Sequence, residues 1–360
     1  MYKKYIRSLL FKGDPEKVHN LTILVGRFLA ASRLSWLLRK NFVFRDKILQ
    51  NKVMGIYFEN PIGLAAGFDK NAYLVDFIPD IGFGFIEVGS VTANPCAGNP
   101  KPRLHRLVKD QGIIVNYGLA NEGVAKVSRR LKGKKFRIPV GISIAKTNNP
   151  NIKGEGSIHD YLKSFKAMKE LGDYTTINIS CPNAGDGKSF EDPVLLESLL
   201  KKVNEIRNKK KILLKISPEI NRNNLNKIIR LAEKYKIEGF IVSNLTKNRK
   251  GLSNNPNLKY PGGVSGKHAR EKSNKLIKYI FKRTKGKFII VGCGGVFSGA
   301  DAYEKIKYGA SLIQMITGMI FEGPGVVSKI NGELVELLKK DGYNNIQEAI
   351  GSGILKNGKK

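Results

Sequence analysis

The chain has 360 residues, of which 41% are hydrophobic, so it holds ample apolar side chains for a large folded core. Three cysteines, odd in number and far apart, exclude a disulfide framework and a zinc site of paired cysteines. Four histidines without i, i+4 spacing exclude the usual helix-borne metal motif, so we expect no metal and a reducing, cytoplasmic compartment.

The net charge of +33 attracts phosphates, whether of nucleic acid or of an anionic membrane, and does not choose between them. The excess is mostly lysine and is spread along the chain, with only short runs such as residues 209–211. Such a spread is more typical of solvated helix faces than of a binding footprint. We therefore expect no nucleic-acid partner.

Residues 1–46 differ from the rest of the chain and predict a two-helix extension. The DPE motif at residues 14–16 is typical of a helix start, with Asp at the N-cap and Pro at the first helical position. A second apolar stretch, residues 34–38, contains a Trp and has basic flanks. Arg27 interrupts the longest apolar run, so none reaches the roughly 18–20 residues of a spanning helix, and no signal-peptide pattern is present. Either the helices lie in a membrane interface, or they pack on the main domain as a helical cap.

From residue 62 onward, short apolar strands alternate eight times with longer amphipathic stretches. The expected strands are Ile62–Gly67, Phe85–Thr92, Pro139–Ala145, Tyr174–Ser180, Ile212–Ser217, Gly239–Asn244, Phe288–Gly295 and Leu312–Gly318. Eight alternations over about 250 residues favour an α/β fold, a (β/α)8 TIM barrel at residues 47–340, with a doubly wound sheet as the alternative. Residues 341–360 are expected to form a polar C-terminal tail.

Polar side chains follow the expected strands at their carboxyl ends, where a barrel places its catalytic loops. They include Lys70, Lys146, Lys215, Ser243 and Asn244. The fourth strand ends in NISCPN at residues 178–183, which cannot continue a sheet. In one interpretation Asn178, Cys181 and Asn183 hold or deprotonate a small polar ligand. In the other, Asn178 caps the barrel rim and Cys181 is a small buried filler.

Glycine-containing segments follow the sixth expected strand, at residues 262–266, and end the seventh and eighth, at residues 292–295 and 317–318. In barrels, the backbone N–H groups of such loops cradle phosphate, so we expect a phosphorylated ligand. Strand-end lysines and amides in place of carboxylates, together with a phosphate cradle, are typical of an FMN site. Cys181 would then be the base, since a thiol pKa of about 8.5 lies closer to neutrality than that of a serine hydroxyl.

Nine short motifs run along the chain in a specific order and spacing. They are LFKGDPEKVH (10–19), NPIGLAAGFDKN (60–71), GFGFIEVGSVT (82–92), GNPKPRLHRL (98–107), NISCPN (178–183), LLKISP (213–218), GGVSG (262–266), VGCGG (291–295) and EGPG (322–325). On these motifs the chain resembles the membrane-associated, quinone-dependent dihydroorotate dehydrogenases along nearly all its length. The resemblance implies FMN-dependent oxidation of dihydroorotate to orotate in pyrimidine biosynthesis, with Cys181 removing the C5 proton. It also implies electron transfer to a membrane quinone and peripheral attachment to the cytoplasmic side of the cell membrane.

The resemblance also implies site residues by position. FMN would be held by Ala66, Gly67, Lys70, Ser90, Ser143, Asn178, Lys215, Ser243, Gly266, Gly295 and Thr317. Substrate would be held by Lys70, Asn178, Asn183 and Asn244, and the quinone side would carry His19 and Arg106. The two N-terminal helices would form the mouth through which the quinone reaches the flavin.

Several positions depart from the family pattern. Cys181 stands where quinone-dependent members usually carry Ser, as in the soluble class. Residues 115–119 read VNYGL instead of Asn-x-Met-Gly-Phe, so the orotate-binding Asn is either lost to Val115 or displaced to Asn116. The family's Asn, Thr and Tyr are replaced by Ser143, Leu245 and Ile316. A missing partner to a buried polar ligand costs about 1–3 kcal/mol, so these changes could retune the substrate.

Dihydroorotate oxidation is the leading hypothesis. The altered pocket motivates a second, an FMN-dependent paralogue that acts on a different dihydropyrimidine-like ring. A third, motivated by the charge of +33, is a flavin enzyme acting on RNA, although no appended basic RNA-binding domain is visible. The fourth is a catalytically silent protein at the membrane surface.

Overall fold

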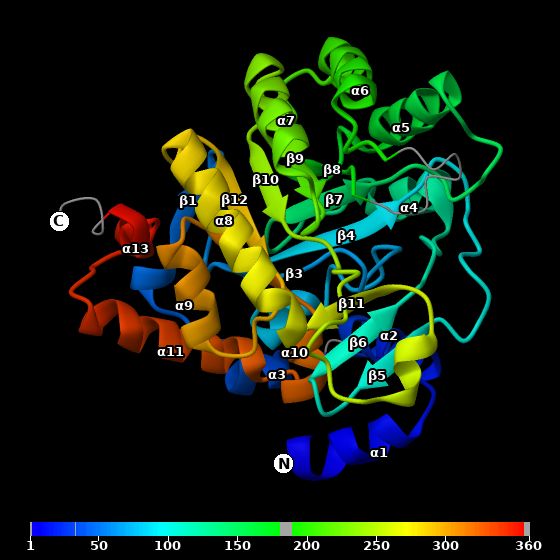
Figure 1. Cartoon of the computed structure of the whole chain (residues 1–360). Coiled ribbons are helices and arrows are strands. Elements are labelled where there is room, and N and C mark those ends of the chain that lie inside the picture. Colours follow the sequence, from blue (N-terminus) through cyan, green and yellow to red (C-terminus); the bar gives the residue numbers. More distant parts are fainter. Residues whose placement is uncertain (1, 33, 181–188, 356–360) are drawn as a thin grey trace.

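Eight parallel strands close into a barrel (Figure 1). In the computed structural model, which describes residues 2–32, 34–180 and 189–355, the barrel strands are β3 (Ile62–Leu64), β4 (Phe85–Val91), β7 (Val140–Ile144), β8 (Tyr174–Asn178), β9 (Lys211–Ile216), β10 (Gly239–Val242), β12 (Ile289–Cys293) and β13 (Leu312–Met315). They follow chain order around the barrel, and β13 pairs with β3. The predicted (β/α)8 barrel is confirmed, and the doubly wound sheet is wrong because the sheet closes on itself.

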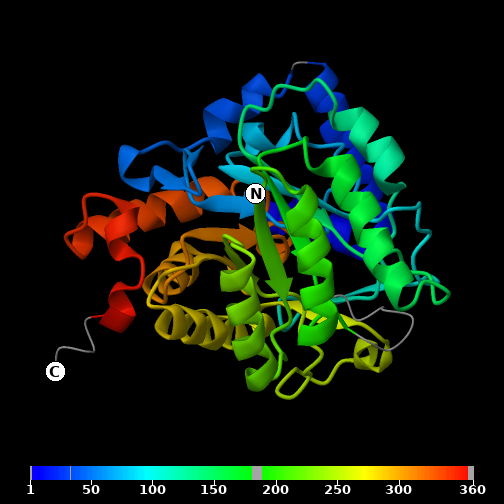
Figure 2. The ribbon, with the colours of Figure 1, turned by 90° about the horizontal axis from the view of Figure 1, so that it is seen from above.

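Helices cover the outside of the barrel because each presents an apolar stripe to it. They include α4 (Gly123–Leu131), α5 (Glu155–Met168), α6 (Pro193–Ile206), α7 (Arg222–Lys234), α8 (Arg270–Thr284), α9 (Gly299–Lys307) and α11 (Val326–Lys340), whereas the short α10 (Thr317–Glu322) lies at the cavity described below. In α7, Leu225, Ile228, Ile229 and Ala232 are buried at helical spacing. Figure 2 shows the green helices α5 to α7 on the side of the barrel away from the red C-terminal segment.

The barrel interior has an apolar floor. Its side chains are Val53, Phe58, Phe85, Tyr174, Leu213, Ile241, Val291 and Leu312. Val53 and Phe58 come from a hairpin of β1 (Asn51–Val53) and β2 (Ile56–Phe58) that the sequence did not predict. The Phe58 and Phe85 rings meet edge to face, with 5.4 Å between centroids. Gly63 makes room for this packing, since a Cβ there would lie 2.3 Å from the Phe85 ring.

A separate antiparallel sheet in the order β11-β6-β5 borders the cavity described below. It consists of β5 (Leu104–Leu107), β6 (Gly112–Val115) and β11 (Gly263–Gly266). The glycine-rich segment at 262–266, expected to be a phosphate-binding turn, is therefore largely a strand. Its central N–H, that of Val264, donates to Thr246 O at 2.7 Å and is not free for a ligand. The Val264 N–H is thereby removed from the expected third set of phosphate donors, whereas Ser265 and Gly266 line the small cavity described below.

The N-terminal extension contains η1 (Tyr2–Ile6), α1 (Arg7–Lys12), α2 (Pro15–Ala31) and α3 (Trp36–Phe42). The Asp14 carboxylate accepts from the N–H groups of Glu16 at 3.0 Å and Lys17 at 2.8 Å, so α2 starts as predicted. The helical stretch before Asp14 was not predicted. Within the described ranges no single helix is long and apolar enough to span a membrane; α2 and α3 pass that test only together, across a bend of 110°.

One face of the extension packs on the main domain. Arg103, which directly precedes β5, donates to both carboxylate oxygens of Glu16, at 3.0 and 2.7 Å. Arg106 on β5 donates to Gly13 O at 2.7 Å, and the Tyr2 hydroxyl donates to Ile320 O on α10 at 2.8 Å. The opposite face leaves large apolar side chains more than half exposed, among them Leu21, Leu24, Phe28 and Trp36. The extension is thus a cap with an exposed apolar surface.

The segment after α11 differs from the expected polar tail. It forms α12 (Ile346–Ala349) and α13 (Ser352–Leu355), in which Ile346 and Ala349 are fully buried and Ile354 is nearly so. The Gly351 N–H donates to Ile306 O of α9 at 3.0 Å. These apolar residues continue the outer core, and the segment lies against α9 and α11 (Figure 1).

Candidate active site

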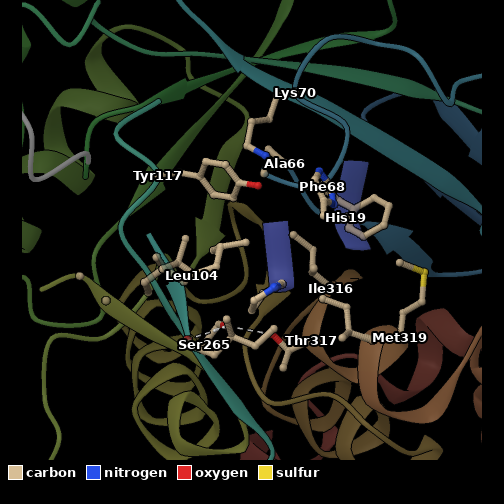
Figure 3. A pocket seen from close by; sticks show the side chains of 18 of the residues that line it. His19, Ala66, Phe68, Lys70, Leu104, Tyr117, Ser265, Ile316, Thr317 and Met319 are labelled. Atoms are coloured by element: carbon tan, nitrogen blue, oxygen red, sulfur yellow. Dashed lines mark hydrogen bonds between the residues drawn. The ribbon is translucent and has the colours of Figure 1, made fainter. Parts of the chain in front are cut away.

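A cavity of about 860 Å³ lies at the carboxyl end of the barrel. Its walls come from strand ends, from β5 and β6, and from α1 and α2 of the extension (Figure 3). A smaller cavity of about 90 Å³ adjoins it, and Ala66, Lys215, Asn244 and Thr317 line both. The barrel rim and the extension therefore face the same space.

Most predicted cofactor residues line these cavities. Ala66, Gly67, Lys70, Ser90, Asn178, Lys215 and Thr317 line the large one, and Ser243, Gly266 and Gly295 line the small one. Ser143 lines neither but lies against Ser90, with 2.7 Å between the hydroxyl oxygens. Of the predicted substrate residues, Lys70, Asn116, Asn178 and Asn244 line the large cavity. Cys181 and Asn183 lie outside the described residues.

A chain of neutral hydrogen-bonding side chains, the rim relay, runs from β7 to the end of β10. Its members are Ser143, Ser90, Asn178, Ser180 and Asn244. Asn178 Nδ2 donates to Ser90 Oγ at 3.1 Å, and Ser180 Oγ donates to Asn178 Oδ1 at 3.1 Å. Asn244 Nδ2 in turn donates to Ser180 Oγ at 2.8 Å. The relay fixes two amides at the rim, which suits a neutral heterocycle with carbonyl and N–H groups.

Lys70 and Tyr117 form another part of the wall. Lys70 Nζ lies 3.7 Å from the centroid of the Tyr117 ring, and the guanidinium carbon of Arg103 lies 4.9 Å from it. Burial lowers the pKa of Lys70 to about 8, against the opposing effect of the Glu16 carboxylate. The ammonium is therefore largely charged at neutral pH and able to attract an anionic ligand.

The Tyr117 hydroxyl points into the cavity (Figure 3). It is buried and has no hydrogen-bond partner among the described residues. A buried hydroxyl without a partner is costly, so its position indicates that a ligand completes it. In the sequence, Tyr117 stands out only as part of the altered loop at residues 115–119, where a residue with a hydroxyl replaces the family's apolar Met.

His19 and Arg106 lie on the extension side of the same cavity. The His19 ring meets Phe68 edge to face at 4.9 Å between centroids. Burial, helped by the charge of Lys70, lowers the pKa of His19 to about 3, so its imidazole is neutral at physiological pH. Arg106 is held by carbonyls of the extension and thereby joins α1 to β5.

The small cavity has the features of a phosphate site. The hydroxyls of Ser265 and Thr317 lie 2.8 Å apart (Figure 3). Gly266, Gly294 and Gly295 line it with φ values of 98°, 117° and 72°. At Gly295 a Cβ would lie 2.5 Å from Arg270 Cβ, so the backbone here depends on glycine. Hydroxyls and close backbone approach are what a phosphate monoester requires.

Most of the departures from the family pattern lie on the large cavity. Val115, Leu245 and Ile316 contribute apolar walls. Asn116 lines the cavity too, but its Oδ1 accepts from Asn99 Nδ2 at 2.9 Å. Within the described ranges, no group of three or more His, Cys, Asp or Glu side chains is placed to hold a metal ion.

Comparison with known proteins agrees with this geometry. The family model described as dihydroorotate dehydrogenase matches residues 48–338. A dihydroorotate dehydrogenase (quinone) of Nostoc punctiforme is 39% identical over 98% of both chains, and one of Christiangramia forsetii is 40% identical over 93% of this chain and 99% of its own.

The crystal structure of ligand-free DHODH from Eimeria tenella has a TM-score of 0.80 and 30% identity, covering 91% of this chain and 99% of its own. The complex of DHODH with ferulenol from the same organism has a TM-score of 0.81 and 30% identity, covering 94% and 95%. The chain belongs to the dihydroorotate dehydrogenase family.

Proposed function

We propose that this protein oxidises dihydroorotate to orotate in pyrimidine biosynthesis, with FMN as cofactor and a membrane quinone as electron acceptor. The main support for the proposal is that this chain, a member of the family, has one cavity with two chemically different sides. The rim relay and Lys70 lie on the barrel side, and a neutral His19 among apolar side chains lies on the extension side. Relatives along nearly the full chain bear the name dihydroorotate dehydrogenase (quinone).

The described residues fit FMN. Ser265, Thr317 and the glycines of the small cavity would hold its phosphate. Lys215 lines both cavities and would place its ammonium near the ring, where positive charge favours the reduced form. Ser90 and Asn178 of the rim relay would meet ring carbonyl and N–H groups. When bound, FMN would supply the hydride-accepting and electron-transferring chemistry.

Dihydroorotate would occupy the barrel side of the cavity. Asn178 and Asn244 would orient its ring, together with Asn183 and with Asn116, if the latter takes the place of the family's loop Asn. Lys70 would attract the negative charge of the substrate. Cys181, which follows Ser180 of the rim relay in sequence, would remove the C5 proton as a general base.

The quinone would enter between the extension and the barrel rim. Apolar side chains from both line that entrance, including Val18, Val25, Phe77 and Ile320. His19 and Arg106 are the polar groups on this side, and the neutral imidazole of His19 is suited to a hydrogen bond with a quinone carbonyl.

Peripheral attachment to the cytoplasmic side of the cell membrane would bring this entrance to the quinone pool. The exposed apolar side chains of α2 and α3, among them Leu24, Phe28 and Trp36, are accompanied by basic residues such as Lys17 and Lys40. An exposed apolar face with basic neighbours is typical of helices that lie in a membrane interface.

The absorbance spectrum of the purified protein tests the proposal most simply. We expect a flavin spectrum that dihydroorotate bleaches in the absence of oxygen. A protein that binds no flavin, or a flavin spectrum that dihydroorotate leaves unchanged, would contradict it.

A second candidate function is the oxidation of a different dihydropyrimidine-like ring. It is favoured by the apolar walls from Val115, Leu245 and Ile316 and by the engagement of Asn116 with Asn99. A panel of dihydropyrimidines, scored by the rate of flavin bleaching, separates the two. The leading proposal requires dihydroorotate to be the fastest of the panel.

A further inference from the structure

A polar layer lies inside the barrel, next to the apolar floor. Its centre is Glu87 on β4, a carboxyl group with no solvent exposure. Glu87 Oε2 accepts from Thr176 Oγ1 at 2.9 Å, from Gln314 Nε2 at 3.0 Å and from the Tyr174 hydroxyl at 3.2 Å. One oxygen of the carboxyl group thus takes three hydrogen bonds.

The other carboxyl oxygen has none. Glu87 Oε1 and Gln314 Oε1 are both buried and lack a hydrogen-bond partner among the described residues. They are the remaining atoms of two planar groups that already share the bond from Gln314 Nε2 to Glu87 Oε2. If Glu87 is ionised, both atoms are acceptors, and two unsatisfied acceptors in the interior are costly.

One proton on Oε1 would remove both deficits. A carboxylic acid protonated there would donate to the amide oxygen of Gln314 while Oε2 accepts from Gln314 Nε2, as in a cyclic acid–amide pair. Complete burial also raises the pKa of Glu87, an effect that the nearby Lys215 opposes. The other ionisable groups that face Glu87 are Tyr174 and Cys293, and burial raises the pKa of each, so both are neutral.

Lys215 links this layer to the active site. Its side chain is 5% exposed, it lines both cavities, and it forms no ion pair with any described carboxylate. A buried anion beside it would cancel much of its charge, because Coulomb interactions are strong in a poorly polarisable interior. A neutral acid leaves the positive charge of the ammonium available at the cavity.

We propose that Glu87 is a protonated carboxylic acid that donates to Gln314, and that its neutral state leaves the Lys215 charge uncompensated at the cofactor site. The part concerning the cofactor rests on the proposed function, whereas the protonation state of Glu87 does not. Glu87 is a positioning residue, acting through Lys215.

Glu87→Gln is the sharpest test, since its amide can reproduce both hydrogen bonds of the protonated acid without a charge. Infrared difference spectra at pH 7, between the wild type and this variant, should show the carbonyl band of a protonated carboxylic acid in the wild type. A carboxylate signal in its place would overturn the proposal. Glu197→Gln, which removes a half-exposed carboxylate paired with Lys234, is the matched control and should remove carboxylate bands only.

The second readout is the flavin reduction potential of the FMN-loaded protein. Glu87→Gln should leave it unchanged, whereas Lys215→Met should make it more negative. A more positive potential in Glu87→Gln would mean that an anion had been removed and would overturn the proposal.

If Glu87→Gln does not fold, Thr176→Val takes its place, because it removes one hydrogen bond to the carboxyl group of Glu87. The same infrared band should then shift. A band that does not move would belong to another acid and would overturn the proposal. If the protein binds no flavin, the proposed function fails, but the infrared measurement on the flavin-free chain still decides the state of Glu87.

Discussion

The barrel side and the extension side of the cavity are built in opposite ways. On the barrel side, adjacent strand ends hold Ser90, Asn178 and Asn244 in a continuous chain of hydrogen bonds. On the extension side, His19 and its apolar neighbours are placed by helices that pack on the main domain through only one face. Rigid polar groups suit a small, polar substrate that must be held in one orientation. An apolar entrance suits a hydrophobic electron acceptor that arrives from a membrane.

The largest effect on the barrel side should come from Cys181→Ala. Without a base for the C5 proton, flavin reduction by dihydroorotate should slow by about 10²–10⁴-fold, the usual contribution of general base catalysis. Stopped-flow absorbance without oxygen measures this rate. FMN content and reoxidation of chemically reduced flavin by quinone should stay at the wild-type level, and a fall in either would place Cys181 outside the role of base.

Breaking the rim relay should have the next largest effect. Asn178→Ala removes a hydrogen-bond partner from Ser90 and from Ser180, and a lost buried partner costs about 1–3 kcal/mol. We expect kcat/KM for dihydroorotate to fall by roughly 10–100-fold, since about 1.4 kcal/mol is a factor of ten. Asn223→Ala, at an exposed position of α7, is the control. Equal losses in both variants would refute a special role for the relay.

The two sides should also differ in their response to pH. The pKa of Lys70 is lowered to about 8, so its positive charge is lost as the pH rises through that value. Binding of orotate, followed by the flavin spectrum, should weaken between pH 7 and pH 9 by up to about tenfold per unit above the pKa. The pKa of His19 is about 3, so the KM for quinone should be flat from pH 5 to pH 7. Orotate affinity that does not change over the alkaline range would show that Lys70 does not attract the substrate.

The smallest effect on catalysis should come from the exposed apolar face of α2. Replacing Leu21, Leu24 and Phe28 by Ser should abolish flotation with anionic liposomes but leave flavin reduction by dihydroorotate unchanged, because these side chains point away from the barrel rim. Val194→Ser, at an exposed apolar position of α6, should float as the wild type does. Flotation of the triple variant at the wild-type level would remove this face from the membrane interface.

The eight barrel strands were predictable because each is an apolar run ended by polar or glycine residues. The hairpin β1–β2 and the sheet of β5, β6 and β11 were missed because, unlike barrel strands of similar length, they stand outside the strand–helix alternation, and most of them contain polar residues or glycine. The tail was misjudged because the buried Ile346, Ala349 and Ile354 are few and lie among polar neighbours.

The residues of the candidate site could be predicted as a set of strand-end residues, but their relative positions and hydrogen bonds could not. That Ser180 bridges Asn178 and Asn244, and that the Tyr117 hydroxyl has no partner, depends on side-chain orientations set by tertiary packing. Glu87 could have been singled out from the sequence. An acid within the apolar run of β4 has to be paired or protonated, which marks its position as unusual.

The central claim is that one cavity carries two separable half-reactions. Stopped-flow measurement of flavin reduction by dihydroorotate and of flavin reoxidation by quinone, in Asn244→Ala and in His19→Ala, tests it most directly. We expect Asn244→Ala to slow reduction alone and His19→Ala to slow reoxidation alone. Equal slowing of both steps in either variant would contradict it.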